Sequence, residues 1–149
     1  MAQALQQDNR IIAQTISPID NSIFIERSLH DASDINEALD SAKMAQKSWR
    51  KLPLEERQEF LTKALEALLS KSDDIALEIT KQMGRPLSQA AGELRGLEER
   101  ARHMIAIAPE ALADVVPTEQ EGFKRYIKRE ALGVVAIIAT WNYPFLTSV

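Results

Sequence analysis

The chain has 149 residues, a formal net charge of −4 and no cysteine. This acidic balance offers nucleic acid no electrostatic attraction, and the lack of cysteine excludes a disulfide, a thiolate metal site and a cysteine nucleophile within these residues. The amino terminus is polar, and the longest apolar run is far shorter than the roughly 20 residues of a membrane span. We therefore expect a cytoplasmic protein with no nucleic-acid or membrane partner and no metal site.

The first elements predicted are a β-hairpin and four helices. Two β-rich runs, residues 11–16 and 22–25, flank a turn that contains Pro18 and predict the hairpin. Four stretches with apolar residues at three- and four-residue spacing then predict helices. They open at Asp34, Leu54, Ser72 and Ser88 and close before Pro53, at Leu69, at Met83 and at Ala108.

Local signals mark the helix ends. Asp34 and Glu37 have the spacing of a capping box, and Gly84 is placed as a carboxyl-terminal stop before Pro86. Within the fourth helix, Glu93 falls on an otherwise apolar stretch, and its simplest interpretation is a hydrogen-bonded structural carboxylate.

Two further β segments follow the helices. Residues 122–130 alternate apolar and charged side chains, which predicts a strand with an exposed charged face at an edge or interface. Residues 134–139 are a continuous β-branched run, typical of a strand buried on both faces of a parallel sheet. Parallel neighbours need crossover connections that these residues do not supply, so we expect the front part of a larger domain.

Chemistry is expected just after the second of these strands, where open α/β sheets bind ligands. An asparagine at this place, Asn142, can donate to an oxygen that becomes negative during a reaction, a contribution of about 2.7–4 kcal/mol in acyl transfer. The alternative is a turn asparagine that caps a following helix, with Pro144 near its start, and spacing alone favours it. Trp141, on the same grounds, is more often a core residue than a ligand platform.

Residues 129–144 change this weighing. They read Arg-Glu-Ala-Leu-Gly-Val-Val-Ala-Ile-Ile-Ala-Thr-Trp-Asn-Tyr-Pro and closely resemble the aldehyde dehydrogenase superfamily, with Ala131 and Thr140 in place of two usual prolines. Residues farther upstream fall in the family's order, so the resemblance covers nearly the whole chain; they are Trp49, Arg57, Leu61, the Met-Gly-Arg-Pro run at 83–86, and Glu93.

The resemblance implies an α/β fold: the helix-rich amino-terminal part of a Rossmann-like cofactor domain, ending just after its first buried parallel strand. Residues 1–112 would supply the hairpin and helices of that domain. Residues 113–131 would reach an oligomerisation sheet, and residues 132–149 would form the buried strand and the Trp-Asn-Tyr-Pro loop.

The resemblance also implies an NAD(P)-dependent oxidation of an aldehyde to a carboxylic acid through a thiohemiacetal. Asn142 would hold the oxyanion, and NAD or NADP would be bound on its adenosine side by Ile138, Ala139, Thr140 and Trp141. The family's cysteine and general-base glutamate lie farther downstream, so we expect these residues alone to be inactive.

The full-length protein would be a homo-oligomer that takes a small aldehyde substrate. The alternative is a non-catalytic, truncated paralogue that acts as a structural or interaction partner of full-length subunits. Its contact edges would be residues 122–130 and 134–139.

Overall fold

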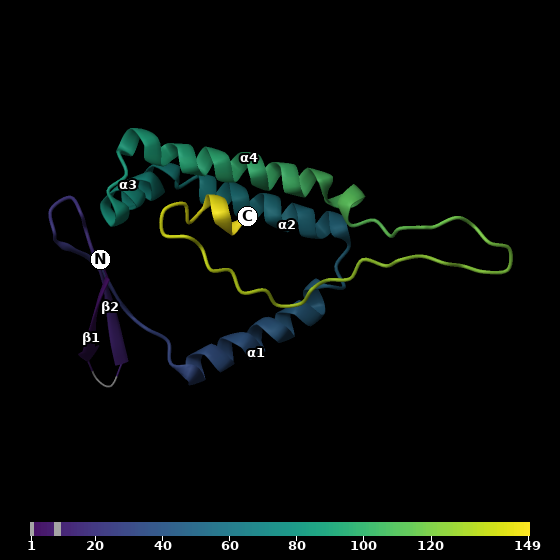
Figure 1. The fold of residues 1–149 in the computed structure, drawn as a ribbon, viewed down its shortest axis with the longest axis horizontal. Coiled ribbons are helices and arrows are strands. Elements are labelled where there is room, and N and C mark those ends of the chain that lie inside the picture. The colour runs from purple at the N-terminus through teal and green to yellow at the C-terminus, as the bar shows by residue number, and fades with distance from the viewer. Residues whose placement is uncertain (1, 8–9) are drawn as a thin grey trace.

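A small antiparallel sheet opens the chain. The computed structural model describes the backbone of residues 2–7 and 10–149 and the side chains of residues 11–149. Strands β1 (Ala2–Gln7), β2 (Arg10–Ile16) and β3 (Ile23–Ser28) pair in the order β1-β2-β3. Figure 1 shows β1 beside β2. The predicted hairpin is thus confirmed as β2 and β3.

Strand β1 was not predicted. It lies in the polar amino-terminal stretch, and its sequence Ala-Gln-Ala-Leu-Gln-Gln lacks the β-branched residues that signal a strand. Residues 1, 8 and 9 of that stretch lie outside the described part of the chain. No helix among the described residues is long and apolar enough to cross a membrane.

Four helices follow, as the periodicity predicts. They are α1 (Ala32–Trp49), α2 (Leu54–Leu69), α3 (Ser72–Met83) and α4 (Leu87–Ala111). The bounds of α2 and α3 match the prediction; Pro53 marks the start of α2 and Gly84 the end of α3. In Figure 1, α2, α3 and α4 form one layer, and α1 lies apart from it.

Helix α1 begins two residues earlier than predicted. Its cap is Asp31, whose Oδ1 accepts from the backbone N–H groups of Ser33 at 2.7 Å and Asp34 at 2.9 Å. The Asp34 carboxylate accepts in return from the N–H of Asp31 at 3.1 Å. The capping box therefore joins Asp31 to Asp34 and not Asp34 to Glu37, because Asp31 has the extended backbone of an N-cap and Asp34 is the third residue of the helix.

Helix α4 runs three residues past its predicted end and takes Pro109 into its last turn. Proline has no N–H and so cannot bond the carbonyl four residues back, which is that of Ile105. That carbonyl instead accepts from Gln58 Nε2 of α2 at 2.6 Å. A side chain of the neighbouring helix thus satisfies the group that the proline leaves free.

The core lies between α2, α3 and α4. One cluster is Leu65, Leu94 and Leu97; the other is Ala76, Ile79 and Ala90. Phe145, from the carboxyl-terminal loop, packs against both clusters. Helix α1 contributes no buried residue, and its predicted apolar face remains exposed among the described residues.

Residues 134–139 differ from the prediction of a buried strand. They form no strand and are exposed, Ile138 to 94%. A strand exists only through hydrogen bonds to a neighbour, and none of the described residues pairs with this run.

Residues 122–130 also differ. The structure has only the isolated bridges Val115–Ile127 and Gln120–Phe123 there, in an extended segment that protrudes beyond the helices (Figure 1).

The left-handed Gly84 offers a test of how the hairpin and α3 meet. Its φ is +78°, and an added Cβ would lie 3.0 Å from Pro18 Cγ in the β2–β3 turn. Gly122 has a φ of +77° but nothing within 4 Å of an added Cβ. We expect Gly122→Ala to lower the free energy of unfolding by about 1–2 kcal/mol, the cost of the left-handed conformation, and Gly84→Ala to lower it by more. Urea titration measures both; equal losses would contradict a role for the Pro18 contact.

Candidate functional site

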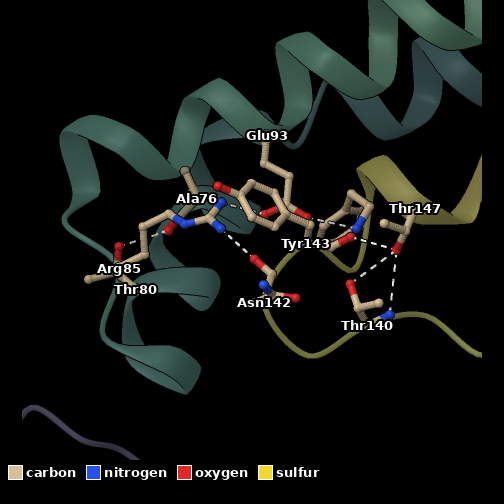
Figure 2. Close-up of polar contacts among 9 residues, drawn as sticks. Ala76, Thr80, Arg85, Glu93, Thr140, Asn142, Tyr143 and Thr147 are labelled. Atoms are coloured by element: carbon tan, nitrogen blue, oxygen red, sulfur yellow. Dashed lines mark hydrogen bonds and ion pairs between the residues drawn. The ribbon is translucent and has the colours of Figure 1, made fainter.

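The candidate site is the loop of residues 141–145, which the helical layer holds from one side (Figure 2). Helix α3 ends at Gly84, whose N–H donates to the Thr80 carbonyl at 2.8 Å, and Pro86 precedes the first turn of α4. Between these two residues, Arg85 is turned toward the loop. Glu93 projects to the same place from the second turn of α4.

Arg85 and Glu93 form a buried ion pair. Arg85 Nη1 lies 2.7 Å from Glu93 Oε2, and the side chains are 12% and 0% exposed. The other carboxylate oxygen, Oε1, accepts from the backbone N–H of Phe145 at 2.8 Å. The interpretation of Glu93 as a hydrogen-bonded structural carboxylate is confirmed.

The guanidinium of Arg85 makes two further contacts with the loop. Its Nη2 donates to the backbone carbonyl of Asn142, and its Cζ lies 4.3 Å from the centroid of the Tyr143 ring. Such a cation–π contact contributes about 0.5–1 kcal/mol at an exposed site and more when desolvated. The ion pair therefore fixes the loop backbone at Asn142 and at Phe145.

The side chain of Asn142 is not used in holding the loop. Among the described residues its side-chain amide makes no hydrogen bond, whereas its backbone carbonyl accepts from Arg85. The alternative of a helix-capping asparagine is not what the structure shows, since the 3-10 helix η1 (Leu146–Ser148) begins after Phe145 and has no side-chain cap. Trp141 is 80% exposed and is not a core residue.

Three of the four residues expected at the cofactor lie together. Ala139, Thr140 and Trp141 line a pocket of about 500 Å³ against residues of β2, β3 and α3, whereas Ile138 is not part of its lining. Thr140 is oriented by Thr147, whose hydroxyl lies 3.4 Å from its N–H nitrogen and 3.3 Å from its Oγ1. Thr147 in turn donates to the Tyr143 carbonyl at 2.7 Å, which connects the pocket wall to the asparagine loop.

A second pocket, of about 740 Å³, is basic and contains none of these loop residues. Its charged lining residues come from several elements: Lys47 of α1, Arg50 and Lys51 beyond it, Arg57 of α2, and Lys128, Arg129 and Glu130. Glu130 bonds Lys128 at 2.7 Å and Arg50 at 3.2 Å. The hydrogen bond from Lys128 is the main cause that lowers the pKa of Glu130, and the same bond raises the pKa of Lys128.

Comparison with known proteins identifies the fold. The sequence model of a family described as "Aldehyde dehydrogenase family" matches residues 5–149. The chain belongs to the aldehyde dehydrogenase family. It corresponds to the amino-terminal part of that family, which confirms the predicted fold class.

Three similar proteins show how much of the family the chain covers. The α-ketoglutaric semialdehyde dehydrogenase of Bacillus subtilis is 31% identical over 113 residues, which are 76% of this chain and 23% of that protein. Succinic semialdehyde dehydrogenase from Streptococcus pyogenes, solved with NADP⁺, is 28% identical with a TM-score of 0.80, and the match covers 90% of this chain and 30% of that one. PnpE, solved with NAD, is 26% identical with a TM-score of 0.82, over 98% and 31%. The chain thus spans roughly a quarter to a third of the length of these three proteins.

Sequence reasoning missed the part that Arg85 plays. The sequence places Arg85 in the Met-Gly-Arg-Pro run, yet the residue binds a loop 57 residues away. The one local signal is its spacing from Glu93, eight residues on across a helix start. That spacing suggests a pair but says nothing about the loop it holds.

Because the Arg85–Glu93 pair is buried, its loss should destabilise the fold. We expect Glu93→Ala to lower the free energy of unfolding by about 3–5 kcal/mol, because it leaves the Arg85 charge buried without a partner. The matched control is Glu98→Ala on the same helix, which breaks the exposed 2.9 Å pair with Arg102 and should cost about 0.5 kcal/mol or less. Urea unfolding of both variants measures the difference. A loss for Glu93→Ala no larger than that of Glu98→Ala would contradict the structure.

The pKa of Glu130 provides a second prediction, on the basic pocket. Because this pKa is lowered in the folded protein, the stabilisation from the carboxylate is present above its ordinary pKa and is lost as pH falls through the lowered one. We expect Lys128→Ala to raise the pKa of Glu130 toward its ordinary value, since Lys128 is the largest cause of the shift. Carboxyl-carbon NMR titration measures it. Lys124→Ala is the control, because the ion pairs of Glu130 are with Lys128 and Arg50. An unchanged pKa of Glu130 in Lys128→Ala would refute the assignment.

Proposed function

We propose that this chain is the front of the cofactor domain of an NAD(P)-dependent aldehyde dehydrogenase that oxidises an aldehyde to a carboxylic acid, with Asn142 as an oxyanion donor. One observation carries the assignment of Asn142. Its backbone carbonyl is bound by Arg85, whereas among the described residues its side-chain amide has no hydrogen-bond partner. The loop is thus fixed and the donor remains available for a ligand.

The proposed role of this amide depends on the negative charge that develops on the aldehyde oxygen. Attack of a thiolate on an aldehyde carbonyl turns the carbonyl oxygen into an oxyanion, and the Asn142 N–H can donate to it. A donor held in place before the reaction needs no reorganisation when the charge develops, and one such donor contributes about 2.7–4 kcal/mol. The chain has no cysteine, so in this proposal the thiolate comes from a residue outside this sequence. The family resemblance assigns the glutamate that activates water to a downstream residue as well.

The cofactor fit is partial and concerns the adenosine side. Ala139, Thr140 and Trp141 line one pocket, and the exposed Ile138 and Trp141 add apolar surface against which a nucleoside can pack. The Thr140 hydroxyl adds a polar group. Among the described residues, no glycine-rich turn for a pyrophosphate stands beside them. NAD(P), when bound, would accept hydride from the aldehyde carbon; the NADP⁺ and NAD in the two similar structures support this cofactor class.

The remaining parts of the proposal concern assembly. We assign residues 1–112 and 132–149 to the cofactor domain and residues 113–131 to an oligomerisation segment of a homo-oligomer. The last assignment is supported by the protrusion of that segment from the helices (Figure 1). It is also supported by exposed apolar side chains there, Val116 at 69% and Phe123 at 66%.

The second candidate is a non-catalytic chain that binds full-length subunits. The exposed apolar run favours it, because Leu132 and Ile138 are each 94% exposed and contiguous apolar surface of this kind marks interaction sites. The two candidates differ in whether the protein encoded by the complete reading frame oxidises aldehydes.

The test begins with that protein. We expect it to form NAD(P)H in the presence of aldehyde, and Asn142→Ala to lower kcat by about 10²–10³-fold. Asn36→Ala, on the exposed face of α1, is the matched control and should leave kcat unchanged. Residues 1–149 alone should form no NAD(P)H. Two results together would replace the first candidate with the second. The whole protein would form no NAD(P)H from aldehyde, and it would capture a full-length dehydrogenase subunit at fixed stoichiometry.

A further inference from the structure

The loop that carries Asn142 is fixed at two backbone atoms by one ion pair. Arg85 donates to the carbonyl of Asn142, and Glu93 accepts from the N–H of Phe145 at 2.8 Å. The two points lie on either side of the Tyr143–Pro144 turn. Figure 2 shows both charged side chains reaching the same loop from the helical layer.

The pair can hold this loop in one arrangement because its groups have no competing partners. The Glu93 side chain is fully buried, and each of its oxygens has one use: Oε2 for Arg85 and Oε1 for Phe145. Arg85 is 12% exposed and is placed against the Tyr143 ring. A buried charge that moves away from its partner is strongly unfavourable, so displacement of the loop is opposed at both points.

The backbone sets where the Asn142 side chain starts and restricts the rotamers that it can adopt. Its carbonyl is bound by Arg85, and the next residue, Tyr143, is stacked on the same guanidinium. These contacts restrict the dihedral angles on both sides of the Asn142–Tyr143 peptide. An oxyanion donor acts only when it lies about 2.7–3.1 Å from the developing charge, and a misplacement of about 1 Å can cost roughly 10²-fold in rate.

We propose that Arg85 and Glu93 are positioning residues for the oxyanion donor Asn142. The proposal rests on the function proposed above and deepens it. Neither side chain contacts the aldehyde; both act through the loop. Their replacement therefore lowers the rate of the step in which the oxyanion forms, and it does so only when Asn142 is present.

A double-mutant cycle on the protein from the complete reading frame tests this. Glu93→Gln keeps an acceptor for Phe145 but removes the charge opposite Arg85, and we expect it to lower kcat about 10–100-fold with little change in the KM for the cofactor. In the Asn142→Ala background the same substitution should produce no further loss. Residues that act as one unit are non-additive, whereas independent sites add.

Two other variants keep the test decisive if Glu93→Gln does not fold. Tyr143→Leu removes the stacked ring from a half-exposed residue and leaves the ion pair intact. Arg85→Lys keeps the charge but loses the planar two-donor geometry. Each should lower kcat severalfold in the wild-type background and not in Asn142→Ala. Glu98→Gln, at a residue paired with the exposed Arg102, is the matched control and should change kcat in neither background.

Exchange of the Phe145 amide proton gives a readout that does not depend on turnover. We expect it to exchange faster in Glu93→Gln and Arg85→Lys than in the wild type, with the amides of α2 unchanged. Additive losses of kcat in an active enzyme, or an unchanged Phe145 amide, would overturn the positioning role alone. A wild-type protein without aldehyde oxidation would overturn the proposed function, and the positioning role with it.

Discussion

The carboxyl-terminal loop depends on the buried pair of Arg85 and Glu93. Burial of two charges costs several kcal/mol per ion unless the pair is well aligned and the remaining donors and acceptors are satisfied. Both conditions need the loop: without it, Glu93 Oε1 would lose the Phe145 N–H and Arg85 Nη2 would lose the Asn142 carbonyl. The loop and the pair therefore stabilise each other. Phe145 adds an apolar contribution by packing against both core clusters.

The rest of the carboxyl-terminal segment lacks such support. Residues 132–138 are apolar yet exposed, and the described residues provide no strand to pair with them. The contrast has one physical cause: the loop meets side chains already present in α3 and α4, whereas a parallel strand needs backbone partners that come through crossover connections. The chain spans 23–31% of the length of the similar proteins, and we expect the partners of this run to come from the remainder of the family's cofactor domain.

The sequence predicts features set by neighbouring residues, such as helix ends. It does not predict contacts between residues that lie far apart in the chain. The start of α2 and the end of α3 follow from Pro53 and Gly84, which act on their own backbone. Residues 134–139 have the composition of a strand, but composition alone does not provide the neighbouring strand with which they would pair. The burial of Glu93 was predictable from its apolar surroundings. Its bond to Phe145 was not, because 52 residues separate the two and no periodicity relates them.

The same distinction applies to the site. The Trp-Asn-Tyr-Pro run can be found in the sequence, but the groups that hold it cannot. Left-handed Gly84 ends α3 and directs the chain so that Arg85 faces the loop.

The presence of a charged pair at this place favours orientation over stability as its role. A buried ion pair replaced by well-packed apolar side chains of similar volume often leaves stability unchanged or improved. Apolar side chains here would fill the space between α3, α4 and the loop, and Phe145 would still pack on the core. They could not donate to the Asn142 carbonyl or accept from the Phe145 N–H. Only a charged or polar pair fixes both backbone atoms, and functional groups carried on loops need such support from rigid elements to be held within about 0.5 Å. In this chain the helices provide that support, and the loop presents the asparagine.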